Sequence, residues 1–197
     1  MVNVYTLPLG AYETNCYVVH GQNSTRCIVI DPGYEAGQIL SFLEKKGLDL
    51  EAILLTHGHF DHVGAVRDLV ALTDCDVYLH REETTMPPQM TAGPLYYTHG
   101  LSKGQTLTLA GLTIGVLHTP GHTPGSVCFQ IEDLLFTGDT LFAGSCGRTD
   151  FPGGSWETIL RSLAFLRDLN IPYQLYPGHG EQTTLEREKL TNPYLRG

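Results

Sequence analysis

The chain has 197 residues, a formal net charge of −9, and an ordinary composition with 42% hydrophobic and 17% charged residues. This length predicts one compact domain over residues 1–197, and the acidic charge argues against nucleic acid as a partner because it repels phosphates. No apolar run is long enough to span a membrane, and the N-terminal segment lacks the basic and apolar regions of a secretory signal. The five cysteines are odd in number and form no C-x-x-C pair, so we expect free thiols, a cytoplasmic location and no membrane partner.

The first 80 residues alternate short apolar runs with segments in which apolar residues recur at helical spacing. The apolar runs predict strands at residues 3–7, 15–20, 26–31, 51–56 and 76–80. The helical spacing predicts helices over residues 36–47, where Gly47 supplies a C-terminal cap, and over residues 62–73.

The chain beyond residue 80 contains an irregular stretch and a second series of strands. Residues 83–105 are rich in proline, glycine and aromatic residues and predict a loop. Strands are expected at residues 105–119, 126–131, 133–139 and 173–178, and helices at residues 156–169 and 181–190. Strands in succession, followed by strands mixed with helices, indicate an α/β protein whose helices cover the outer faces of sheets.

A dense group of metal-competent side chains follows the strand predicted at residues 51–56. The segment THGHFDH, residues 56–62, contains three histidines and one aspartate. His57 and His59 are two residues apart, so they converge only in an extended or turn segment, while His62 starts the next helix and can turn back toward them. Surface histidines are the alternative, but the H-x-H-x-D-H spacing seldom arises by chance. Imidazole and carboxylate groups together suit Zn²⁺, Fe²⁺ or Mn²⁺, so the segment predicts a metal site.

Three further candidate ligands each follow an apolar run and lie near glycine. They are His122 in TPGHTPGS, Asp139 in LLFTGDTLF and His179 in LYPGHGE. One such residue alone is more typical of a structural role, but all three lie where a predicted strand ends, and sites are commonly built at that edge of a sheet. The sequence therefore predicts that these three residues join the THGHFDH segment around bound metal.

Together with the upstream IDPG, these motifs resemble the metallo-β-lactamase superfamily over nearly the whole chain. The resemblance implies an αβ/βα four-layer sandwich of two mixed β-sheets flanked by helices, with two metal ions at one edge. It assigns one ion to His57, His59 and His122, the other ion to Asp61, His62 and His179, and a bridging position to Asp139. Asp31 in IDPG would orient a ligand or the metal-binding loop; an aspartate that only forms the turn before Pro32 is the alternative.

The segments LFAGSCGRTDFPGG and PGHGEQTTLEREKLTNPYL resemble the short bacterial glyoxalase II-like hydrolases. This resemblance implies a hydrolase with two divalent metal ions, zinc first, with iron or manganese as alternatives. A hydroxide held by the metals would attack a thioester carbonyl, with S-2-hydroxyacylglutathione as the expected substrate type and Asp61 as the catalytic carboxylate. The bridging aspartate disfavours lactam cleavage, and the chain has no room for the inserted domain of nucleic-acid-processing members.

Two other functions remain open from the sequence. The SCGRTDF segment also resembles persulfide dioxygenases, which are mononuclear iron members of the superfamily that oxidise glutathione persulfide. A metal-binding module without catalysis is the remaining alternative. The number and identity of the bound metal ions would separate the two enzymes.

Three residues are candidates for substrate contact. Arg148 falls where glyoxalase II has a basic residue that grips a substrate carboxylate; a structural pair with Asp150 is the alternative. Tyr96 and Tyr97 would line an apolar wall over the site, or else belong to a packed loop. The expected partner is a small-molecule thioester, and nothing in the sequence specifies an oligomer.

Overall fold

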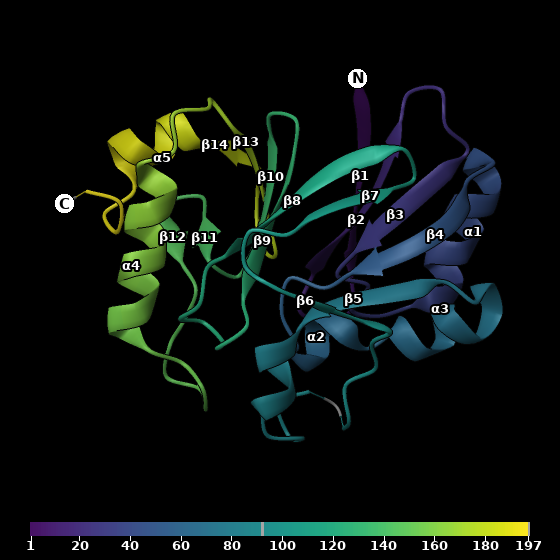
Figure 1. The fold of residues 1–197 in the computed structure, drawn as a ribbon, viewed down its shortest axis with the longest axis horizontal. Coiled ribbons are helices and arrows are strands. Elements are labelled where there is room, and N and C mark those ends of the chain that lie inside the picture. The colour runs from purple at the N-terminus through teal and green to yellow at the C-terminus, as the bar shows by residue number, and fades with distance from the viewer. Residues whose placement is uncertain (92, 197) are drawn as a thin grey trace.

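The structure is a computed structural model that describes residues 1–91 and 93–196. Within these residues, two six-stranded sheets lie between two groups of helices (Figure 1). The first sheet has the order β1-β2-β3-β4-β5-β6. Its strands are β1 (Val2–Leu9), β2 (Thr14–Gly21), β3 (Arg26–Ile30), β4 (Asp49–Leu54), β5 (Asp76–His80) and β6 (His99–Leu101). β1 to β3 pair antiparallel and β3 to β6 pair parallel, so several carboxyl ends meet at one edge.

The second sheet has the order β14-β13-β10-β9-β8-β7. Its strands are β7 (Thr106–Leu109), β8 (Leu112–His118), β9 (Val127–Ile131), β10 (Leu134–Gly138), β13 (Gln174–Pro177) and β14 (Thr183–Thr184). β10 and β13 run parallel, and the other neighbours are antiparallel. A small hairpin of β11 (Leu141–Phe142) and β12 (Ser145–Cys146) follows β10.

The helices form the two outer layers of the sandwich. The first sheet is covered by α1 (Ala36–Lys46) and α3 (Val66–Thr73), and the second by α4 (Trp156–Arg167) and α5 (Leu185–Thr191). Ile39 of α1 and Leu69 of α3 belong to the core between the first sheet and its helices, and Ile159 of α4 belongs to the core between the second sheet and its helices. Phe129 and Phe136 lie in the core between the two sheets. This arrangement confirms the predicted four-layer α/β sandwich. None of the described helices is both long and apolar enough to cross a membrane.

One predicted helix is broken. The prediction of a continuous helix over residues 62–73 was wrong, because α2 (Phe60–Val63) ends before α3 begins. The N–H of Ala65 donates to the carbonyl oxygen of Pro32 at 3.0 Å instead of to a carbonyl of the preceding turn. The break ties the segment after His62 to the loop that carries Asp31.

Other elements also differ from prediction. The stretch at 83–105 is not all loop, because it holds the end of a 3₁₀ helix, η1 (Arg81–Thr85), and all of β6. The last helix begins at Leu185 rather than at residue 181, because Thr183 pairs with β13 and Thr184 caps the helix by accepting the Arg187 N–H at 3.2 Å. The β11–β12 hairpin was not predicted.

Candidate metal centre

The candidate ligands lie at one edge of the sandwich, where strands of both sheets end. Each segment begins one to four residues beyond its strand: His57, His59, Asp61 and His62 follow β4, His122 follows β8, Asp139 follows β10, and His179 follows β13. His59 is extended, with φ −65° and ψ 147°, and immediately precedes α2. The segment therefore has His59 on extended backbone and His62 on the helix, as expected from its spacing.

Three buried histidines form the first group. The ring centroids of His57 and His59 lie 4.8 Å apart, those of His59 and His122 lie 4.6 Å apart, and those of His57 and His122 lie 4.8 Å apart. Nδ1 of His59 is 2.9 Å from Nε2 of His122. Their nitrogens are close enough together to serve one metal ion.

Asp61, His62 and His179 form the second group. Oδ2 of Asp61 lies 3.3 Å from Nε2 of His179 and 3.7 Å from Nε2 of His62. Asp139 lies between the groups: its Oδ1 is 3.4 Å from Nε2 of His62, and its Oδ2 is 3.6 Å from Nε2 of both His122 and His179. One carboxylate thus reaches imidazoles of both groups.

Hydrogen bonds at Nδ1 turn four imidazoles toward the centre. The acceptors are Oγ1 of Thr56 for His57 at 3.1 Å, Oδ2 of Asp31 for His62 at 3.0 Å, the Arg148 carbonyl for His122 at 2.8 Å, and the Tyr12 carbonyl for His179 at 3.2 Å. Because carbonyl and carboxylate oxygens only accept, Nδ1 carries a proton and Nε2 is the nitrogen that faces the cluster. The Thr56 hydroxyl donates to Asp31 and so accepts from His57. Such partners at Nδ1 are typical of metal-binding histidines.

Four buried polar atoms at this place have no hydrogen-bond partner among the described residues. They are Nε2 of His57, His59 and His62, and Oδ1 of Asp139. Buried polar atoms are normally paired because an unpaired one costs about 1–3 kcal/mol. Imidazole nitrogens and carboxylate oxygens are a donor set for zinc, iron or manganese, so the residues present fit divalent metal ions.

Asp31 joins two of the ligand-bearing positions. Its side chain is buried, Oδ1 accepts the Thr56 N–H at 2.8 Å, and Oδ2 accepts the Thr56 hydroxyl at 2.6 Å as well as Nδ1 of His62. The residue has a φ of +52°, which is uncommon for a residue with a side chain. Asp31 thus makes hydrogen bonds to Thr56 and to the His62 ring in addition to its place in the turn before Pro32.

Burial and mutual charge shift the pKa values within the cluster. Burial lowers the pKa of His57 well below its ordinary value, and burial together with His122 lowers that of His59 to about 4. Burial also acts against charge on His62, but Asp139, Asp31 and Asp61 outweigh it and raise its pKa to about 9. Burial opposes ionisation of Asp61, yet the hydrogen bond from His179 and the nearby imidazoles hold its carboxyl pKa well below the ordinary range.

Glu83 is a functional candidate that the sequence did not single out. It lies on η1, is fully buried, and accepts backbone N–H groups of Gly58 and Gly125. Burial raises the pKa of its carboxyl, while hydrogen bonds from Thr123, Gly58 and Gly125 oppose the rise. Its neighbours in REETT are ordinary surface residues, so no sequence signal marked it out.

The candidate substrate residues lie outside the cluster. Both guanidinium Nε and Nη2 of Arg148 donate to Asp150 at 2.7 Å, and the guanidinium carbon lies 3.8 Å from the ring centroid of Phe151. Tyr96 packs against the core under α3, with Arg67 5.6 Å above its ring, and Tyr97 is exposed. The pair with Asp150 that the sequence left open is present, and none of the described contacts of the two tyrosines is with a candidate ligand.

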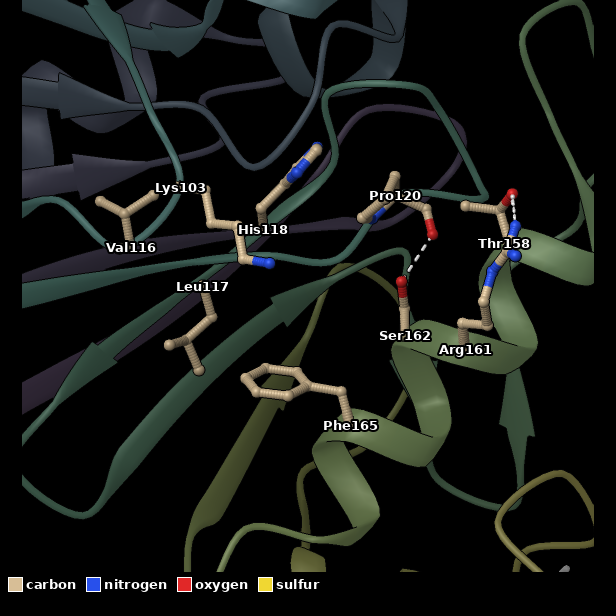
Figure 2. A pocket seen from close by; sticks show the side chains of 10 residues that line it. Lys103, Val116, Leu117, His118, Pro120, Thr158, Arg161, Ser162 and Phe165 are labelled. Carbon is tan, nitrogen blue, oxygen red and sulfur yellow. Dashed lines mark hydrogen bonds between the residues drawn. The ribbon is translucent and has the colours of Figure 1, made fainter.

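Two other features near the centre are separate from it. His80, Glu82 and His118 lie together, but the two rings are stacked 4.3 Å apart at 15°, so their in-plane lone pairs run side by side and do not converge on one ion. A hollow of about 350 Å³ lies between β8 and α4, with an apolar lining that includes Leu117 and Phe165 (Figure 2). None of the candidate ligands lines this hollow.

The fold and site define a class of α/β-sandwich proteins with a histidine- and aspartate-rich centre at one edge. The profile of the metallo-beta-lactamase superfamily matches residues 9–179, so the chain belongs to this superfamily. It is 35% identical over 209 residues to the hydroxyacylglutathione hydrolase GloC of Haemophilus influenzae, covering 98% of both chains.

Solved structures agree with this membership. The structure of the BLEG-1 B3 metallo-beta-lactamase superposes with a TM-score of 0.89 and 37% identity, covering 100% of both chains. The structure of TTHA1623 in a di-iron-bound form superposes with a TM-score of 0.86 and 38% identity, covering 98% of this chain and 100% of the other. The superfamily is thus shared by proteins that bear the names of different hydrolases.

Proposed function

We propose that the protein is a dinuclear metal-dependent hydrolase that cleaves thioesters of the S-2-hydroxyacylglutathione type. The observation that carries the proposal is the position of the Asp139 carboxylate, whose buried Oδ1 is unpartnered among the described residues and lies 3.4 Å from the unpartnered Nε2 of His62, and whose Oδ2 lies 3.6 Å from Nε2 of His122 and of His179. The 35% identity to GloC over nearly the full length of both chains supports this substrate class.

Two ions would divide the cluster between them. His57, His59 and His122 would hold one ion, Asp61, His62 and His179 would hold the other, and Asp139 would contribute to both. We take zinc as the first candidate metal, with iron and manganese as alternatives, and the di-iron form of TTHA1623 gives iron particular weight. When bound, such ions supply an ionised water near neutral pH and positive charge beside the substrate carbonyl.

The chain's own residues hold the reacting groups in place. Asp61 is ionised because its pKa is held low, so its free carboxylate oxygen accepts a hydrogen bond from the attacking water and orients it. The hydroxyl of Thr14 donates to Asp61 Oδ2 at 3.4 Å and keeps that carboxylate in place. Asp31 keeps His62 in the tautomer that faces the cluster.

Substrate recognition falls to the rim of the centre. The backbone carbonyl of Arg148 accepts a hydrogen bond from Nδ1 of His122, which places Arg148 beside the centre. Its guanidinium is at the surface and pairs with Asp150, and it would release Asp150 to bind a carboxylate of glutathione. Tyr96 and Tyr97 remain candidates for the thiol-carrier side. We also assign the protein one domain and a cytoplasmic location, consistent with its five free cysteines.

The test is turnover of S-lactoylglutathione by protein loaded separately with zinc, iron and manganese, with chelator-treated protein as the control. Nitrocefin, a β-lactam, is assayed in parallel because BLEG-1 carries the name of a lactamase at 37% identity. We expect thioester hydrolysis to exceed lactam hydrolysis with at least one metal. Lactam turnover without thioester turnover would overturn the substrate assignment, and one iron per chain with oxygen uptake on glutathione persulfide would favour the dioxygenase alternative.

A further inference from the structure

A carboxylate that forms no ion pair with any described residue lies buried between the two histidine segments of the first group. The side chain of Glu83 on η1 has no exposed surface. Burying a charged group is costly unless hydrogen bonds replace its water, so its position calls for fixed donors. The hydrogen bonds that the Glu83 carboxylate accepts therefore indicate its role.

Each oxygen of Glu83 accepts one backbone N–H from a different ligand-bearing segment. Oε2 accepts from Gly58 at 2.6 Å, and Oε1 accepts from Gly125 at 2.7 Å. Gly58 lies between His57 and His59, at the end of β4 in the first sheet. Gly125 belongs to the loop of His122, which follows β8 in the second sheet.

The space around this carboxylate is closed. A Cβ atom at Gly58 would lie 3.0 Å from Oε2 of Glu83, and a Cβ atom at Gly125 would lie 2.8 Å from Oε1. Real Cβ atoms essentially never come closer than 3.0 Å to a neighbour, so a side chain at Gly125 would force a shift, and the 3.0 Å contact at Gly58 is tighter than nine in ten real Cβ contacts. Backbone and carboxylate are thus in direct contact on both sides.

The two segments joined by Glu83 carry all three histidines of the first group. Nδ1 of His59 and Nε2 of His122 are only 2.9 Å apart, although they come from different sheets. The spacing of these donor atoms has to be held to a fraction of an ångström for tight metal binding. Glu83 is the shared acceptor that fixes the distance between the two backbones.

We propose that Glu83 is a positioning residue that sets the separation of the His57–His59 segment and the His122 loop, and thereby the metal affinity of the first group. This inference rests on the proposed metal centre. Glu83 itself contacts no candidate ligand side chain among its described hydrogen bonds and acts through the backbone of Gly58 and Gly125.

The test is the Co²⁺ affinity of folded Glu83→Gln protein, measured by competition titration and by the visible absorption of bound cobalt. The glutamine keeps the shape of the side chain but turns an NH₂ group toward one of the two backbone N–H donors. One of the two hydrogen bonds that join the segments is therefore lost. We expect a loss of roughly 10- to 100-fold in affinity at one of two sites and a changed cobalt spectrum. Glu83→Asp, which is shorter but still accepts, serves if the glutamine variant does not fold.

Two matched glutamates serve as controls. Glu188 is equally buried and accepts hydrogen bonds from the Gly144 N–H and the Thr183 hydroxyl, both at 2.7 Å. Glu188→Gln therefore removes one of two comparable hydrogen bonds at a place away from the histidine segments. Glu82→Gln removes a neighbouring exposed charge from the same short helix. Both variants should keep wild-type cobalt affinity, even where Glu188→Gln lowers the melting temperature of the metal-free protein.

The outcomes separate this inference from the proposed function. Wild-type affinity and spectrum in a folded Glu83 variant would overturn the positioning role while leaving the metal centre intact. Equal losses in the Glu83 and Glu188 variants would also overturn it, because the effect would then be general destabilisation. Wild-type protein that binds no metal would contradict the metal centre itself, and the inference with it.

Discussion

Oδ1 of Asp139 lies 3.4 Å from Nε2 of His62, and both atoms are buried without a hydrogen-bond partner among the described residues. The other oxygen of the same carboxylate lies 3.6 Å from Nε2 of His122 and of His179. A carboxylate in this position joins the two groups of candidate ligands. A centre with two metal ions therefore depends most on Asp139.

Asp139→Asn should lower metal content toward one ion or fewer per chain. The substitution replaces one acceptor oxygen with an NH₂ group that cannot ligate a metal, so the bridge between the groups is lost. Thioester turnover should fall by roughly 10²- to 10³-fold, the range typical for loss of one charge-stabilising group. Metal analysis and a turnover assay measure both effects. Asp133→Asn, in the exposed turn before β10, is the control and should leave them unchanged.

Asp31→Asn should weaken metal binding while leaving the ligands in place. Both oxygens of Asp31 accept hydrogen bonds, from Thr56 and from His62. The asparagine amide would replace one accepting oxygen with an NH₂ group, so at least one of these hydrogen bonds would be lost. Partners of this kind typically contribute roughly 10- to 100-fold to metal affinity. Competition titration of the folded variant gives the value. Unchanged affinity would mean that Asp31 only shapes the turn before Pro32.

Metal binding by the second group should tighten as pH rises. The aspartates around His62 raise the pKa of its imidazole to about 9, so in metal-free protein a proton occupies the ring at neutral pH and the metal must displace it. Each unit of pH below about 9 should weaken that site by about tenfold for one displaced proton. His57 and His59 have lowered pKa values and add little proton competition near neutral pH. Calorimetry in buffers of different ionisation enthalpy would detect the released proton; a titration in which both sites respond equally to pH would contradict this assignment.

Arg148 and Asp150 should have opposite effects on an anionic thioester. Arg148 donates two hydrogen bonds that hold the pKa of the Asp150 carboxyl at about 2, so the guanidinium already has a carboxylate partner. Arg148→Ala should raise the KM for S-lactoylglutathione roughly tenfold, and Asp150→Asn should lower it because the guanidinium is released. Steady-state kinetics with a thioester of an uncharged thiol provide the comparison. Equal effects on charged and uncharged thiols would assign Arg148 a structural role.

Phe136→Ala should destabilise the metal-free protein by about 3–5 kcal/mol. The ring is fully buried between the sheets, 5.2 Å from the Tyr17 centroid and 4.9 Å from the Tyr176 centroid, so truncation leaves a cavity. Urea unfolding of chelator-treated protein gives the difference. Phe165 lies on α4 and is 46% exposed, so Phe165→Ala should change the free energy of unfolding by only about 0.5 kcal/mol.

The positions of the candidate ligands were predictable because they depend on local pattern. His122, Asp139 and His179 each follow an apolar run, and the apolar runs did become strands with ends at a common edge. The alternation of strands and helices likewise indicated sheets covered by helices, while the four-layer sandwich was implied by the family resemblance. Short-range chemistry therefore determined both the elements and the place of the centre.

Features set by distant contacts were not predictable. The helical pattern runs on through Gly64, and only the bond from Ala65 to Pro32 separates α2 from α3. Strand β6 has three residues and gains its conformation from pairing beside β5. Glu83 is marked by burial and by its contacts with Gly58 and Gly125, and none of these is visible in the residues around it.

The most direct measurement is a crystal structure of metal-loaded protein with anomalous scattering recorded at the metal absorption edge. We expect two anomalous peaks, one on each side of the Asp139 carboxylate, the first among His57, His59 and His122 and the second among Asp61, His62 and His179. A single peak, or peaks away from Asp139, would contradict the dinuclear centre.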